Sequence, residues 1–129
     1  MEQLTTIAKA LADTTRLRLL LALAGGELCA CQLQELIGCA PSTLSAHLGQ
    51  LVRAGLASSR KEGRWVYYRL ADATIRPAAE ALTWVETHAA LRPQARADAQ
   101  RIKKLRKLGP EQLCCQRTQQ CLPNKEVRS

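Results

Sequence analysis

The sequence of 129 residues predicts a mostly α-helical domain that carries one β-hairpin. In residues 41–56, leucine recurs at helical spacing, so one face is apolar and the opposite face carries short polar side chains. Residues 57–70 place basic side chains around Glu62 and Gly63 and then alternate with a period of two, as a hairpin does. A helix with a small polar face beside a basic hairpin is typical of DNA binding.

Composition sets limits on the function. The net charge of +8 and the pI near 9.6 favour an anionic partner over a surface whose charge merely keeps the protein in solution. A hydrophobic content of 47% supports one core, and the absence of Phe favours helix packing. No apolar run reaches the length of a membrane span and no export signal opens the chain, so we expect a cytoplasmic protein that does not contact membranes.

Periodicity and breaker residues predict the remaining elements. Asp13 and Thr14 supply an N-cap, and Gly38 is expected to stop a helix that begins near Leu28. Pro77 falls early in the long helix after the hairpin, so that helix is expected to begin at Asp72 with a kink, or at Ala78. The expected helices cover residues 2–11, 15–24, 28–37, 41–54, 73–91 and 95–108, and the expected domains are 1–91 and 92–129.

The first and last helices carry apolar stripes outside this helix-turn-helix and hairpin. Two interpretations remain open from the pattern: the stripes complete the core of a monomer, or they are buried against a second copy of the chain.

Four motifs then carry a family resemblance. LADTTRLRLL at residues 11–20, ELCACQL at 27–33, SAHLGQLVRAGL at 45–56 and RKEGRWVYYRL at 60–70 together resemble the ArsR/SmtB family. The resemblance spans residues 4 to about 90. It implies a winged helix-turn-helix of four helices, two strands and a further helix. It also implies a dimer, formed through the first and last helices, that represses transcription and releases operator DNA on binding a metal or metalloid.

The resemblance assigns the second helix of the motif to the major groove and the hairpin, or wing, to phosphate or the minor groove. Hydroxyl and imidazole groups bond base edges, and guanidinium groups pair with phosphate. An alternative role for His47 is packing against the turn. Two symmetric recognition helices imply an operator that is an inverted repeat. The expected DNA-binding residues are Ser42, Thr43, Ser45, His47, Gln50, Arg60, Lys61 and Arg64.

The cysteines are candidate ligands of the inducer. Our first choice is Cys114, Cys115 and Cys121, whose spacing is similar to the C-terminal site of one arsenite-responsive branch of the family. The second choice is Cys29 and Cys31, which resemble the third-helix site of other arsenite sensors, although Gln34 stands where the third thiol would be. Residues i and i+2 of a regular helix point apart, so this pair requires an unwound first turn. Cys39 is expected to be a small buried residue.

Ligand chemistry predicts the inducer. Three thiolates suit soft, thiophilic As(III) or Sb(III), with no organic cofactor, whereas zinc normally takes a fourth ligand. Asp72-Ala73-Thr74 also lacks the histidine of the zinc-sensing pattern in the family.

Three alternatives remain. A repressor of the same fold that is switched by disulfide formation is one of them. A small thiol enzyme is disfavoured, because no Cys-x-x-Cys lies in a βαβ setting, and we expect no enzymatic activity. An RNA-binding protein would need an aromatic stacking platform, which the sequence does not offer.

Overall fold

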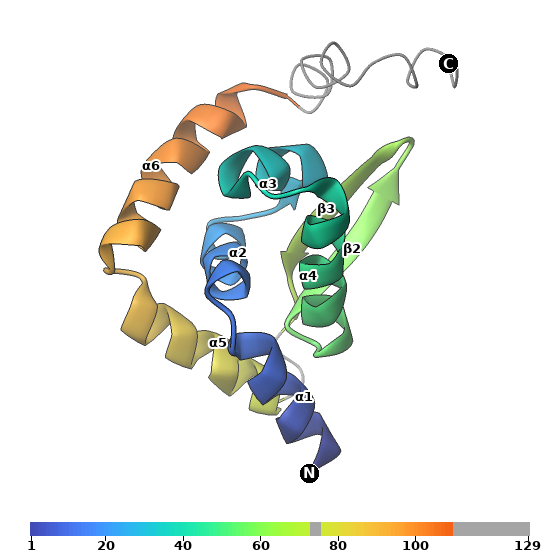
Figure 1. The fold of residues 1–129 in the computed structure, drawn as a ribbon, viewed down its shortest axis with the longest axis vertical. Helices are drawn as coiled ribbons and strands as arrows, with labels where there is room; N and C mark the ends of the chain where they lie inside the picture. The colour runs from blue at the N-terminus through green and yellow to red at the C-terminus, as the bar shows by residue number, and fades with distance from the viewer. Residues whose placement is uncertain (73–75, 110–129) are drawn as a thin grey trace.

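The computed structural model describes residues 1–72 and 76–109 and confirms a winged helix-turn-helix. Its nine elements follow the chain as shown in Figure 1. They are α1 (Glu2–Leu11), α2 (Thr14–Ala24), β1 (Leu28–Cys29), α3 (Ala30–Ile37), α4 (Pro41–Arg53), β2 (Ala57–Glu62), β3 (Trp65–Leu70), α5 (Arg76–Ala89) and α6 (Pro93–Lys107).

Helix α2 is the centre of the molecule. It packs against α1, α4, α5, α6 and β3, and its Leu19, Leu20 and Leu23 are almost completely buried. Leu33 from α3 and Leu48 and Leu51 from α4 extend the same core. Burying a leucine side chain contributes roughly 1.5–3 kcal/mol to the free energy of unfolding. This leucine cluster is therefore a main source of stability in a chain that has no Phe.

The helix-turn-helix consists of α3 and α4, and glycine and proline define the turn between them. Gly38 ends α3 with φ = 80°, the left-handed conformation that glycine adopts without strain. Pro41 occupies the first turn of α4, where its missing N–H is not needed. Leu44, Leu48 and Leu51 then face the core, as the spacing predicted, and this fixes which side of α4 faces outward.

The sheet has three strands rather than the two of the predicted hairpin. Its order is β1-β3-β2, and both pairs are antiparallel. The expectation that Leu28 begins the third helix is wrong, because Leu28 lies in β1 opposite Tyr68. Helix α3 starts only at Ala30, after Cys29 has acted as its N-cap. Two residues are too few for a strand periodicity to be recognised in the sequence.

The last two helices wrap around α2 in an arc, seen at the left and lower side of Figure 1. Pro77 is the second residue of α5 and therefore lies in its first turn, while residues 73–75 are outside the described residues. Helix α6 packs on α2 and α3, and Ile102 and Leu105 join the core of the chain itself. None of the described helices is long and apolar enough to cross a membrane.

Candidate DNA-binding surface and cysteine positions

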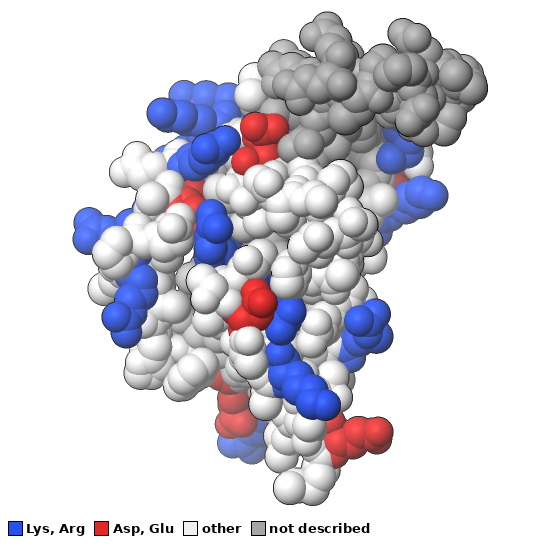
Figure 2. Space-filling model, viewed as in Figure 1, with Lys and Arg blue, Asp and Glu red and all other residues white. Residues whose placement is uncertain are grey.

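The outward face of α4 is small, polar and accessible. Ser42, Thr43 and Ser45 are exposed, whereas Gln50 is half-buried farther along the helix. Figure 2 shows a largely uncharged area over this part of the molecule, with charged side chains of both signs around its margins. A helix of this kind approaches base edges closely, because no long side chain separates it from the groove.

His47 of α4 contacts Arg16 of α2. Nη1 of Arg16 lies 3.0 Å from Nδ1 of His47. The same guanidinium donates to the carbonyls of Ala10 at 2.7 Å and Lys9 at 3.0 Å, and Asp13 lies 3.9 Å away. Arg16 therefore joins the end of α1, the start of α2 and the middle of α4. His47 lies on α4 and is half-buried against this cation, and its contact with DNA stays a prediction.

The wing cations differ in their surroundings. Arg60 donates from Nε and Nη2 to both carboxylate oxygens of Glu27, at 2.8 Å each, and from Nη1 to Glu62 at 2.6 Å. Its guanidinium also lies 4.5 Å from the centre of the Tyr67 ring. Lys61 and Arg64 are exposed and form no ion pair with any described residue, although Arg64 lies over the Trp65 ring.

These contacts shift the titration of the pair. The hydrogen bonds from Arg60 hold the pKa of Glu27 below the 4.5 usual for glutamate, and Glu27 and Glu62 raise the pKa of Arg60 further. Of the three wing cations predicted to meet DNA, Arg60 is thus already paired with two carboxylates, whereas Lys61 and Arg64 form no ion pair with a described residue and are available to phosphate.

Cys29 caps α3 with its sulfur. Sγ accepts from the backbone N–H of Gln32 at 3.4 Å, and the Gln32 side chain accepts from the N–H of Cys29 at 2.9 Å, which completes a capping box. Cys29 is 1% exposed and Cys31 is half-buried on α3. Residues i and i+2 of a regular helix point apart, which argued against Cys29 and Cys31 as a shared site. That argument does not apply to this pair, because Cys29 lies outside α3.

The other cysteine predictions have separate outcomes. Gln34, at the third ligand position of the second-choice site, is buried and donates to the carbonyl of Cys39. The Cys39 side chain is half-buried. Cys114, Cys115 and Cys121 lie outside the described residues. Within residues 1–72 and 76–109, no three His, Cys, Asp or Glu side chains form a group that could hold a metal ion.

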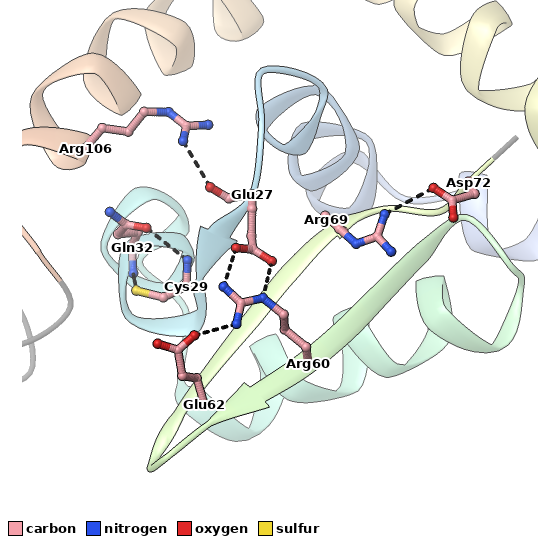
Figure 3. Close-up of polar contacts among 8 residues, drawn as sticks. All are labelled: Glu27, Cys29, Gln32, Arg60, Glu62, Arg69, Asp72 and Arg106. Carbon is pink, nitrogen blue, oxygen red and sulfur yellow. Dashed lines mark hydrogen bonds and ion pairs between the residues drawn. The ribbon is translucent and has the colours of Figure 1, made fainter.

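Four residues that shape this surface were missed from the sequence: Arg16, Glu27, Gln32 and Arg106. Arg106 donates to the carbonyls of Glu27 and Gly26, and Gln32 donates to those of Leu105 and Leu108 (Figure 3 shows Arg106 and Gln32 beside Glu27). Most of these contacts join residues more than 70 positions apart, so local spacing gives no signal for them.

Known proteins are similar to this chain in sequence and in fold. A family model described as bacterial regulatory protein, arsR family, matches residues 13–59. The arsenic resistance transcriptional regulator ArsR1 of Pseudomonas putida is 46% identical over 65 residues, which cover 50% of this chain and 51% of that protein. The arsenical resistance operon repressor of Staphylococcus aureus is 42% identical over 74 residues, which cover 57% of this chain and 71% of that repressor. The match thus spans about half the length of the first relative and more of the second.

A solved structure with a similar fold is also that of a DNA-binding domain. The homodimeric winged helix-turn-helix DNA-binding domain from Mycobacterium bovis has a TM-score of 0.59 and 33% identity, with 71% of this chain and 82% of that chain covered. These relatives and structural neighbours are transcription regulators and not enzymes, in agreement with the sequence-based expectation. The matched region includes the helix-turn-helix itself, α3 and α4. The chain belongs to the arsR family of bacterial regulatory proteins.

Proposed function

We propose that the protein is a homodimeric repressor that binds an inverted-repeat operator and leaves it when As(III) or Sb(III) binds cysteine thiolates. The observation that carries the DNA-binding part is the exposed face of α4 beside the free wing cations Lys61 and Arg64. Ser42, Thr43 and Ser45 would bond base edges and the wing cations would pair with phosphate. The names of the relatives support arsenic as the effector.

Dimerisation is supported by apolar side chains that the single chain leaves exposed. Leu4 on α1 is 52% exposed and Trp84 on α5 is 57% exposed. Helices α1 and α5 pack together, so both side chains belong to neighbouring elements. The homodimeric M. bovis domain has the same fold. A second copy that covers these two helices would remove this apolar surface from water and place two α4 helices for two half-sites.

The proposed ligands of the metalloid are Cys114, Cys115 and Cys121. Three thiolates satisfy a trivalent metalloid without a further ligand, and the neighbouring Lys and Arg residues favour the thiolate form. Cys29 is the weaker candidate, since its sulfur is buried and already accepts a hydrogen bond. Cys29 and Cys31 remain the second choice.

The test is a titration of labelled inverted-repeat DNA with the reduced protein, followed by arsenite, antimonite, zinc or peroxide in separate samples. We expect arsenite and antimonite to release the DNA and zinc to leave it bound. A complete reversal from 1:99 to 99:1 requires an anticoupling of about 5.5 kcal/mol between metalloid and operator.

Matched cysteine variants identify the ligands. Cys114→Ser with Cys115→Ser should bind DNA normally and no longer respond to arsenite, whereas Cys39→Ser should respond as the wild type does. Normal release by the double variant would exclude the site in residues 110–129, here called the tail. Loss of release in Cys29→Ser or Cys31→Ser would then favour the second choice. Release by peroxide alone, reversed by dithiothreitol, would favour the disulfide-switched repressor instead.

A further inference from the structure

A continuous series of polar contacts connects the last turn of α6 to the wing. Arg106 on α6 donates from Nη1 to the carbonyl of Glu27 at 3.0 Å and from Nη2 to that of Gly26 at 3.2 Å. The side chain of Glu27 then holds Arg60 through two hydrogen bonds, and Arg60 holds Glu62. Figure 3 shows Glu27 between the two arginines, with its backbone toward Arg106 and its carboxylate toward Arg60.

Gly26 gives Arg106 the space for this contact. Its φ is 131°, and a Cβ at this position would meet Nη2 of Arg106 at 3.4 Å. A larger residue would therefore be strained in its backbone, and its Cβ would be in van der Waals contact with the guanidinium. The contact therefore depends on glycine at position 26 and on two backbone carbonyls, and Arg106 is more than a freely solvated cation.

Arg60 is the wing residue that this series of contacts reaches. All three of its guanidinium nitrogens donate to carboxylates, and one face of the group covers Tyr67. In this arrangement Arg60 fastens β2 to the residue before β1, which is also the residue that Arg106 holds. Lys61, the next residue along the wing, has no such partner among the described residues and is exposed.

A second link joins the same end of α6 to the helix-turn-helix. Nε2 of Gln32 donates to the carbonyls of Leu105 at 3.3 Å and Leu108 at 3.4 Å, while its Oε1 accepts from Cys29. Two carbonyls at the end of α6, those of Leu105 and of the C-cap Leu108, thus accept hydrogen bonds from α3. Movement of this helix end would break bonds to Gln32 of α3 and to Gly26 and Glu27, which precede β1.

We propose that Arg106 and Glu27 are positioning residues, which set the wing through Arg60 and couple it to the last turn of α6. The chain passes from this turn into residues 110–129, which contain the three candidate thiols. In this proposal a ligand bound there acts on the last turn of α6 through the continuous chain, and loss of the Arg106 contacts frees Glu27 and hence Arg60. The ligand-dependent half of this inference rests on the proposed function.

The first experiment compares Arg106→Gln with Lys103→Gln, which removes an exposed cation from the same helix. Operator affinity is measured by fluorescence anisotropy over a range of salt concentrations. We expect Arg106→Gln to weaken binding about fivefold, the effect of losing one to two hydrogen bonds, with an unchanged slope of log K against log salt. Lys103→Gln should stay within about twofold of wild type, and Arg106→Lys should recover most of the lost affinity.

Two outcomes overturn the positioning role of Arg106. A shallower salt slope in Arg106→Gln would make Arg106 a direct phosphate ligand, because each lost phosphate contact lowers the slope by about 0.9. An affinity equal to that of Lys103→Gln would leave the contact without consequence for DNA binding.

A double-mutant cycle between Arg106→Gln and Arg60→Gln tests the series itself. If both residues act through Glu27, the operator affinity of the double variant should be about equal to that of whichever single variant binds DNA less tightly. Losses that multiply would show two independent effects and would overturn the coupling through Glu27. This measurement needs no metalloid.

The arsenite arm then separates the two proposals. In Arg106→Gln, the factor by which arsenite weakens DNA binding should fall by about tenfold, while titration of free thiols shows the same number of cysteines protected by arsenite as in wild type. An undiminished factor would overturn the coupling to the tail. If the wild type itself does not respond to arsenite, the proposed function fails, and the cycle still decides whether Arg106 sets the wing.

Discussion

Arg16 and His47 join α2 to the recognition helix, with Nη1 of Arg16 3.0 Å from Nδ1 of His47. A guanidinium only donates hydrogen bonds, so Nδ1 is the acceptor in this contact. The hydrogen-bond pattern therefore assigns the ring N–H to Nε2. Nε2–H is then the donor that His47 offers on the recognition helix.

Replacement of Arg16 should loosen the joint between α1, α2 and α4. Arg16→Lys keeps the charge and loses the fork that reaches Ala10, Lys9 and His47 together. We expect a decrease of about 2 kcal/mol in the free energy of unfolding, measured with urea. Arg53→Lys, at an exposed position of α4, should change it by less than about 0.5 kcal/mol, and equal effects of the two variants would contradict the role of Arg16.

Asp13 makes stability depend on pH at the acidic end. Burial alone would raise its pKa, but the N–H groups of Arg16 and Thr15 and the charges of Arg16 and His47 lower it below 3.8. The charged form is thus favoured by folding, so its contribution is complete above pH 3.8 and is lost as the pH falls through the lower pKa of the folded protein.

Two substitutions of Asp13 test this dependence. Asp13→Asn should retain the N-cap at neutral pH, whereas Asp13→Ala should cost about 1 kcal/mol. In urea unfolding, the advantage of wild type over Asp13→Asn should shrink as the pH falls below 3.8. An advantage that grows toward acid would contradict the lowered pKa.

The ion pair between Arg18 and Asp98 fixes α6 on α2. Asp98 is 7% exposed and accepts from Arg18 at 2.8 Å and 3.0 Å, and this bonding raises the pKa of Arg18. Asp98→Asn should lower the free energy of unfolding by roughly 2 kcal/mol, because it leaves a partly buried guanidinium without its charge partner. The matched control is Asp72→Asn, whose exposed pair with Arg69 should contribute less than about 1 kcal/mol in the same assay.

The wing should show its free cations in the salt dependence of DNA binding. Lys61→Gln removes an available phosphate ligand from each protomer, and each lost contact should reduce the slope of log K against log salt by about 0.9. Arg60→Gln should leave the slope unchanged, because Glu27 and Glu62 already hold its guanidinium. Equal reductions in the two variants would place Arg60 on the DNA.

The sequence predicted the elements whose signals are local. The N-cap at Asp13, the stop at Gly38 and the leucine spacing of α4 all lie within a few residues of what they determine. The family resemblance supplied the fold, and the comparisons confirmed it.

Features that depend on distant partners were not predictable. β1 exists because Leu28 and Cys29 meet β3, forty positions later, and Asp98 is buried because Arg18 pairs with it across 80 positions. Arg60 illustrates the same limit at the candidate site. A basic residue on a wing is expected to contact DNA. Its neighbours in the sequence do not indicate that Glu27, 33 positions earlier, binds it.

The sulfur at the start of α3 has a consequence for reactivity. An oxygen side chain is the usual acceptor at a helix N-cap, and sulfur is a weaker one. Here Sγ of Cys29 receives the N–H of Gln32, whose side chain also secures the end of α6. Because this sulfur is 1% exposed, a reagent reaches the thiol only when the start of α3 opens. The rate at which the thiol reacts therefore reports how often the entrance of the helix-turn-helix opens, a signal that a serine cap would lack.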